Sequence, residues 1–285
     1  DGTDDSATTF DKLLGAAIAF SQEIKLQTKK KRVAIILPPG KGGMVANLAV
    51  LLAGKIPVNI NFTSSSSAIE SALEQANIKT VYSSKLFIDK LKSTKGIDLR
   101  EALTQTQVVY MEDLKAKISK AELLCLWVQI KLLPTFLLKL LYCHANDPEQ
   151  IAAILFSSGS EGDPKGIMLS HRNIMANSKQ ISDVLNTQGD DVVMASLPLF
   201  HALGMTVTQF MPLIEGLPLV CHADPTDAVN IGKAISQYRA TMLFGTSTFL
   251  RLYTKNRKVH PLMFDSLRFV VAGAATRTGR KNYLT

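Results

Sequence analysis

The sequence predicts an α/β fold with two layered subdomains, each built on a mostly parallel sheet. Short apolar runs of strand length alternate with longer stretches whose apolar residues recur at helical spacing. The runs are apolar on both faces, which is typical of parallel strands covered by helices on both sides. The alternation also restarts after a polar linker at 144–150, so we expect a first subdomain at 1–148 and a second at 149–285.

The first subdomain begins with a helix over 8–27 and a buried strand in 32–40, which ends at two prolines and a glycine. A helix over 41–55, closed near Gly54, and a strand over 56–62 follow. The next helix, 64–77, has Ser67 and Glu70 spaced as a capping box. Two further strands, 79–84 and 107–112, enclose a short helix near 84–92.

The most hydrophobic segment is 122–143, which is interrupted by Gln129, Lys131, Pro134 and Lys139. A membrane-spanning helix needs about 20 apolar residues with few charges, so we do not expect a crossing. Two interpretations stay open. The segment is either a helical hairpin packed on the protein's own core, or an amphipathic pair that contacts a membrane surface or a lipid-handling partner.

The second subdomain repeats the pattern, beginning with a strand at 151–158. The helix at 169–185 is predicted to be capped by Ser170. Four strand-to-loop transitions complete it, at 191–205, 217–223, 240–248 and 266–274.

Charge and cysteine content exclude several classes of function. The net charge of +8 suits phosphate-bearing ligands or an anionic membrane surface. The densest basic run, 29–32, lacks interleaved aromatics, so we expect no nucleic-acid partner. Three scattered cysteines form neither a disulfide framework nor a metal-ligand cluster, which favours a reducing compartment and predicts no metal ligands. The first residues are acidic and polar, so we expect no signal peptide, and the missing initial Met suggests a longer parent chain.

A loop rich in hydroxyls and glycines follows the strand that ends near Phe156. Such a loop offers backbone N–H groups and hydroxyls to an anion, and a lysine adds a positive charge. A Walker loop needs a lysine between glycine and a hydroxyl residue, and a dinucleotide loop needs a different glycine spacing. We therefore expect phosphate binding of another kind, by Ser157, Ser158, Gly159, Ser160, Gly162, Lys165 and Gly166.

The segment SSGSEGDPKG, 157–166, resembles the signature loop of the adenylate-forming (AMP-binding) superfamily, which includes acyl-CoA synthetases. LPLFHALGMT, LFGTSTFL and VVAGA resemble later motifs of the family in the same order. Glu161 and the segment 33–63 narrow the resemblance to the synthetase part of bacterial acyl-acyl-carrier-protein synthetase / 2-acylglycerophosphoethanolamine acyltransferases. The resemblance implies an incomplete large N-terminal domain of an adenylate-forming enzyme.

It also implies a chemistry. In this superfamily, a fatty acid carboxylate attacks the α-phosphate of ATP, and a phosphopantetheine thiol, here of acyl carrier protein, then attacks the acyl-adenylate. The loop would hold the β- and γ-phosphates, with Lys165 as a catalytic residue and Glu161 pointing outward. Gly245 and Thr246 would lie near the acyl chain or the nucleotide, with Ser247 or Thr248 capping the next helix. The adenine would pass beside Ala272, Gly273 and Ala274.

His201 is the second catalytic candidate, because it resembles the residue beside the acyl pocket and thiol route. Three roles stay open for it: a packed structural residue, a gate that contacts substrate, and a general base. The other histidines, His144, His171, His222 and His260, are interpreted as structural or loop residues, since none has the spacing of metal ligands.

The sequence departs from the family after Ala274, where a basic, polar tail replaces the expected continuation. The glutamate that would hold Mg²⁺ is expected beyond residue 285, so we expect this chain alone to have little or no ligase activity. Two alternatives to a fatty acid–carrier protein ligase stay open: a long-chain acyl-CoA ligase, and a non-catalytic nucleotide- or lipid-binding remnant. We expect a cytoplasmic protein, either free or at the inner face of the bacterial membrane.

Overall fold

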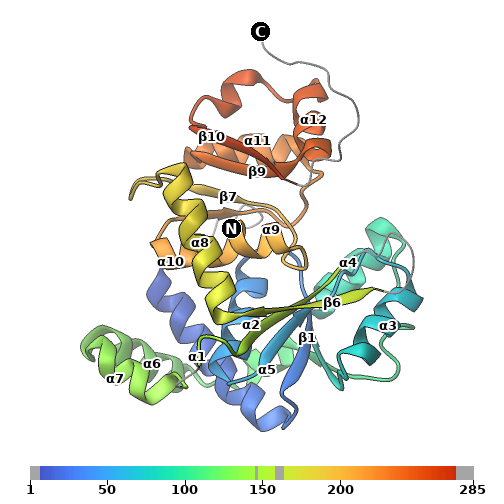
Figure 1. Ribbon diagram of the computed structural model, residues 1–285, viewed down its shortest axis with the longest axis vertical. Coiled ribbons are helices and arrows are strands. Elements are labelled where there is room, and N and C mark those ends of the chain that lie inside the picture. The colour runs from blue at the N-terminus through green and yellow to red at the C-terminus, as the bar shows by residue number, and fades with distance from the viewer. Residues whose placement is uncertain (1–6, 145–146, 158–163, 274–285) are drawn as a thin grey trace.

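The computed structural model describes residues 7–144, 147–157 and 164–273, which form two sheets with helices packed on them (Figure 1). The strands are β1 Arg32–Ile36, β2 Ile56–Asn59, β3 Thr80–Ser83, β4 Gln107–Tyr110, β5 Ile151–Ser157, β6 Lys165–Ser170, β7 Val193–Ala195, β8 Leu219–Cys221, β9 Met242–Thr246 and β10 Phe269–Gly273. The helices are α1 Phe10–Gln27, α2 Lys41–Leu52, α3 Ser66–Gln75, α4 Lys85–Lys95, α5 Met111–Lys117, α6 Lys120–Leu132, α7 Thr135–Tyr142, α8 His171–Leu185, α9 Ala202–Met205, α10 Met211–Glu215, α11 Ala228–Tyr238 and α12 Ser247–Lys255. A π-helical turn, Thr206–Phe210, joins α9 to α10, and a 3₁₀ turn, Pro261–Phe264, precedes β10.

The first sheet has the strand order β4-β3-β1-β2-β5-β6 and is parallel except for the last pair. Strand β6 was not predicted, because the sequence after the glycine-rich loop was interpreted as leading to a helix. It runs antiparallel to β5, so the loop is the tip of a β-hairpin. Both strands join the sheet of the first half, and the predicted boundary at 148/149 therefore does not coincide with the division between the sheets.

The second sheet is parallel and has the order β10-β9-β7-β8. The four predicted strand-to-loop transitions therefore lie side by side, with their carboxyl ends at one edge. The predicted α/β class with mostly parallel sheets is confirmed.

The central strands β1, β2 and β3 of the first sheet are buried on both faces, to which their alternate residues point. On one face, Val58 and Val81 pack against Leu73 of α3. On the other, Val33 and Ile35 pack in one cluster with residues of α1 and α2. This layering explains why the strands are apolar on both faces.

The helix caps differ in part from the predicted ones. The side chain of Ser65 caps α3 by accepting from the backbone N–H of Ala68, so the predicted capping box of Ser67 and Glu70 was wrong. The cap of α8 is confirmed, and it is a full capping box in which Ser170 and Asn173 exchange side-chain and backbone hydrogen bonds.

Segment 122–143 forms two short helices, α6 and α7, with a break at Pro134. The pair lies at the periphery of the molecule beside α1 (Figure 1). Within the described ranges, no helix combines the length and the apolar character needed to cross a membrane.

Candidate functional site

The site begins at the hairpin between β5 and β6. Ser157, the last residue of β5, is in register with Lys165, the first residue of β6, and its Oγ donates to the Lys165 carbonyl over 3.5 Å. The Lys165 side chain is exposed. Gly166 faces the Phe156 ring so closely that a Cβ would lie 3.3 Å from it. Of the predicted phosphate-binding residues, Ser158, Gly159, Ser160 and Gly162 lie outside the described residues.

The loop after β7 carries His201 and packs on the first sheet. Phe200 lies edge-on to Phe62, which follows β2, with 5.0 Å between ring centroids. His201 lies 4.6 Å from Phe200 in the same way and is exposed to solvent on its outer side. Desolvation on the inner side lowers the pKa of His201 below its usual 6.5, so the imidazole is neutral at physiological pH.

The carboxyl ends of β9 and β10 lie side by side in the second sheet. Parallel pairing places Gly245 beside Ala272 and Thr246 beside Gly273. A Cβ on Gly273 would lie 2.2 Å from Leu203 of α9, so the end of β10 contacts the helix that follows His201. The Thr246 hydroxyl caps α12 by accepting from the Phe249 N–H, which corrects the cap expected at residue 247 or 248. Ala274 lies outside the described residues.

The loop 196–203 therefore joins the carboxyl ends of strands from both sheets. Phe200 belongs to the core cluster of the first sheet, against which Phe156 also packs, and Leu203 contacts the end of β10. Ligands of open parallel sheets bind outside the carboxyl ends of the strands, so this edge is the candidate site. Phe62 was not predicted to take part in the site, because it was assigned to the strand 56–62; β2 ends at Asn59 and leaves Phe62 in the loop that follows.

A cavity of about 230 Å³ lies beside the hairpin and was not predicted. Its walls come from the loop after β2, from one face of α3 and from the base of the hairpin. The lining residues are Ile60, Asn61, Ser64, Ser65, Ala68, Ile69, Ala72, Phe156, Ser157 and Pro164. Its hydroxyl-bearing walls adjoin the two hairpin strands that the glycine-rich loop connects.

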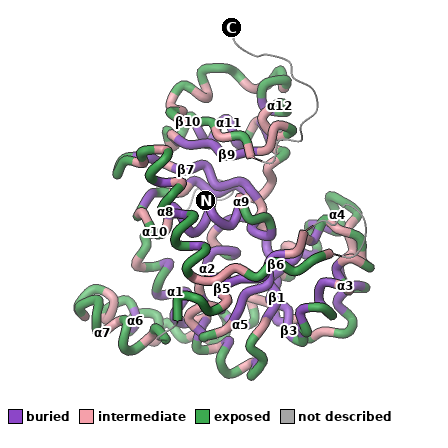
Figure 2. Tube along the Cα trace, in the orientation of Figure 1, coloured by how far each residue is buried: buried purple, intermediate pink, exposed green. Residues whose placement is uncertain are grey.

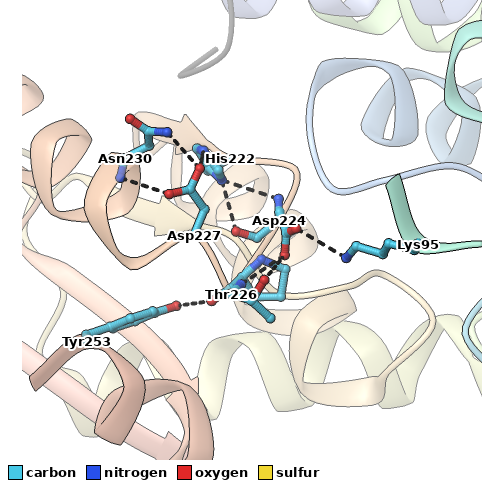
Figure 3. Close-up of polar contacts among 8 residues, drawn as sticks. Lys95, His222, Asp224, Thr226, Asp227, Asn230 and Tyr253 are labelled. Carbon is cyan, nitrogen blue, oxygen red and sulfur yellow. Dashed lines mark hydrogen bonds and ion pairs between the residues drawn. The ribbon is translucent and has the colours of Figure 1, made fainter. Parts of the chain in front are cut away.

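A second polar cluster surrounds His222 in the turn between β8 and α11 (Figure 3). Buried His222 contacts the backbone of Asp224 through Nδ1 and lies 3.6 Å from the Asp227 carboxylate through Nε2. Asp227 caps α11 by accepting from the Asn230 N–H, and the Tyr253 hydroxyl donates to the Pro225 carbonyl. The polar groups around His222 serve caps and turns, and Lys95 forms an ion pair with Asp224, so we assign the cluster to structure, as expected for His222.

Neither a metal centre nor a disulfide is formed by the part of the chain that the structure describes. No group of three or more His, Cys, Asp or Glu side chains there is placed to hold a metal ion. Cys125, Cys143 and Cys221 are free thiols.

Comparison with known proteins agrees with this geometry. Residues 4–279 match the family described as AMP-binding enzyme. A long-chain-fatty-acid–CoA ligase of Escherichia coli O157:H7 is 26% identical over an alignment 288 residues long, which covers 93% of this chain and 51% of that protein. The chain therefore spans about half the length of this curated relative.

Two solved structures of o-succinylbenzoate CoA synthetase from Bacillus subtilis have the same fold. The complex with the acyl-adenylate intermediate OSB-AMP has a TM-score of 0.75 at 19% identity, over 96% of this chain and 64% of that one. The complex with ATP and magnesium ion has a TM-score of 0.72 at 19% identity, over 94% and 50%.

Proposed function

Since the chain belongs to the AMP-binding enzyme family, we propose that it is part of an ATP-dependent enzyme that activates a fatty acid as its acyl-adenylate. The observation that carries this proposal is that the loop 196–203 connects three motif segments across the two sheets. The hairpin of β5 and β6, the His201 loop and the paired ends of β9 and β10 all lie at carboxyl ends of strands. This is the place where an open α/β sheet binds a nucleotide.

In the proposed reaction, a carboxylate oxygen of the acid bonds to the α-phosphorus of ATP. The bond from that phosphorus to the oxygen that bridges it to the β-phosphate breaks, and pyrophosphate leaves. Positioning and neutralisation of negative charge accelerate such a step. We assign this role to Lys165, Ser157 and the loop between them, which includes Ser158, Ser160 and Gly162. Gly245, Thr246, Ala272, Gly273 and Ala274 would line the acyl and adenine subsites.

For His201, we favour a gate beside the acyl carbon over a general base, because no carboxylate among the described residues forms a hydrogen bond or ion pair with its ring. A neutral ring packed edge-on against Phe200 is an uncharged wall. Such a wall suits the approach of an apolar acyl chain. Bound Mg²⁺ would supply neutralisation of phosphate charge, and the described residues form no group of three or more His, Cys, Asp or Glu side chains to hold it.

We propose a phosphopantetheine thiol as the second substrate. Its sulfur would bond to the acyl carbon while AMP leaves. Acyl carrier protein is the first candidate, on the resemblance of Glu161 and segment 33–63 to that subfamily. CoA is the second candidate, because the curated relative is named a CoA ligase. The free cysteines suit a cytoplasmic compartment.

The test uses the protein at its natural length, incubated with ATP, palmitate and hydroxylamine. We expect an ATP-dependent hydroxamate, since hydroxylamine traps the acyl-adenylate. Carrier protein and CoA, offered in turn and followed by mass spectrometry, then identify the acceptor. A protein that binds ATP but forms no hydroxamate with fatty acids of any chain length would instead be a non-catalytic remnant.

A further inference from the structure

The helical pair α6–α7, here called the hairpin pair, exposes a large apolar surface. Figure 2 shows the pair mostly as exposed, with intermediate stretches between. Leu132 and Leu140 are each 77% exposed, and α7 contains no buried residue. The exposed apolar side chains are Leu123, Leu124, Trp127, Val128, Leu132, Phe136, Leu140 and Leu141. Exposed apolar groups in such number on one element mark an interaction surface.

The opposite side of the pair is anchored to the protein. Leu126 is buried against Ile18 of α1, and Ile130 packs on the same cluster. Lys131 forms an ion pair with Asp11 of α1, and within the pair the Tyr142 hydroxyl donates to the Gln129 side chain and joins α7 to α6. One side of the pair therefore already packs on α1. The apolar side chains on its other side are exposed although the pair is folded against the protein.

The charge around this surface is positive. The hairpin pair itself contains three lysines, at 120, 131 and 139, and one acidic residue, Glu122. Lys131 pairs with Asp11, and Lys120 and Lys139 are exposed. A surface that is both apolar and basic complements the acyl chains and the anionic headgroups of a lipid bilayer.

We propose that the hairpin pair docks the protein on the surface of an anionic lipid bilayer, with both helices lying along the headgroup boundary. At 1.5 Å per residue, α6 and α7 are about 20 Å and about 12 Å long, which suits helices that lie on a surface. Two copies of the chain would bring like charges together at this face, which disfavours self-association. The proposal does not depend on the acyl-adenylate chemistry.

Vesicle flotation tests it, with the 285-residue chain and vesicles of phosphatidylcholine, alone or with an equal part of phosphatidylglycerol. We expect the chain to float with the anionic vesicles. The triple variant Leu124→Ser/Leu132→Ser/Leu140→Ser should lose at least about tenfold in partitioning. The variant Lys120→Gln/Lys139→Gln should lose roughly 25-fold, since each lysine near an anionic surface contributes about fivefold. The variant Leu26→Ser/Leu86→Ser/Leu262→Ser removes three leucines exposed elsewhere and should float like the parent chain.

Circular dichroism melting of each variant checks that the fold is retained. Flotation that is absent, equal on neutral vesicles or unchanged in the first triple variant would overturn the proposal. Sedimentation velocity without lipid tests the other occupant of the surface. A dimer that forms in the parent chain and is lost in the first triple variant would make the face a protein–protein interface, and the proposal would be wrong.

Discussion

At the scale of single residues, Lys165 carries the sharpest functional prediction. Its side chain is exposed at the first residue of β6, so the folded core gains little from it. If it neutralises phosphate charge, Lys165→Ala should lower ATP-dependent hydroxamate formation by about 10²-fold. The melting temperature should stay within about one degree, because surface substitutions are close to neutral.

Lys233→Ala, at an exposed lysine of α11, is the matched control and should leave the rate unchanged. Equal rates in the Lys165→Ala variant and the parent would remove Lys165 from the phosphate site. If the rate falls and the melting temperature also falls by several degrees, Lys165 acts on the stability of the fold.

A second residue, Asp191, holds together the amino ends of three strands of the second sheet. Its buried carboxylate accepts from Arg268 before β10, from the Thr241 hydroxyl before β9 at 2.7 Å and from the Gln188 N–H at 2.8 Å. Burial alone would raise its pKa, but the bonds from Arg268, Gln188 and Thr241 outweigh it, and the pKa of Asp191 is lowered. The ionised form is therefore the stable one.

Asp191→Asn should lower the free energy of unfolding by about 2 to 3 kcal/mol at neutral pH. Because the carboxylate pKa is lower in the folded state, its charge stabilises the fold at pH values above the unfolded pKa of about 4. This contribution is lost as pH falls through the folded pKa. The gap between variant and parent should therefore narrow in acid. Urea unfolding at several pH values measures this gap. Exposed Asp190→Asn is the control, and a gap independent of pH would contradict the charge-based explanation.

At the scale of elements, the sequence predicted most strands and helices, because their apolar spacing records burial directly. The sequence did not predict β6, because this strand is exposed along most of its length and has no apolar pattern of strand length. Only pairing with β5 makes it a strand. The cap of α3 was misplaced for a related reason: four consecutive serines offer several caps, and the geometry of the chain entering the helix selects Ser65. Local patterns could not decide either case.

The loop that carries His201 depends on Gly204 in α9. A Cβ there would lie 2.1 Å from the Pro198 carbonyl oxygen, and a backbone atom cannot move aside easily. Gly204→Ala should therefore cost at least about 2 kcal/mol of unfolding free energy and should reduce adenylate formation by displacing His201. Gly42→Ala in α2, where a Cβ meets nothing within 4 Å, is the matched control and should be neutral or slightly stabilising. Equal melting temperatures for the two variants would show that the loop relaxes.

At the scale of the whole molecule, the candidate site could be predicted only as separate segments. The sequence placed motif residues after individual strands, and the parallel order of two sheets then brought the strand ends together. The contacts that join the sheets were not visible in it. They link residues far apart in the chain, such as Phe62 with Phe200 and Lys95 with Asp224.

These two contacts should differ strongly in energy. Phe200 and Phe62 are both buried, so Phe200→Ala should destabilise the protein by about 3 to 5 kcal/mol, through lost burial and an unfilled cavity. Phe136→Ala, at a phenylalanine that is 67% exposed on α7, is the control and should change stability by less than about 0.5 kcal/mol. The Lys95–Asp224 ion pair spans 3.2 Å, but its side chains are 43% and 36% exposed (Figure 3).

A double-mutant cycle of Lys95→Met and Asp224→Asn should therefore give a coupling of at most about 1 kcal/mol, because water and salt screen exposed pairs. Urea unfolding at low and high salt measures it, and we expect the coupling to vanish at high salt. If the cycle gave a larger coupling than the loss in Phe200→Ala, charge would hold the two sheets together. The smaller coupling that we expect means that the aromatic contact beneath His201 does so, and that the stability of the site and of the sheet-to-sheet junction rest on the same side chain.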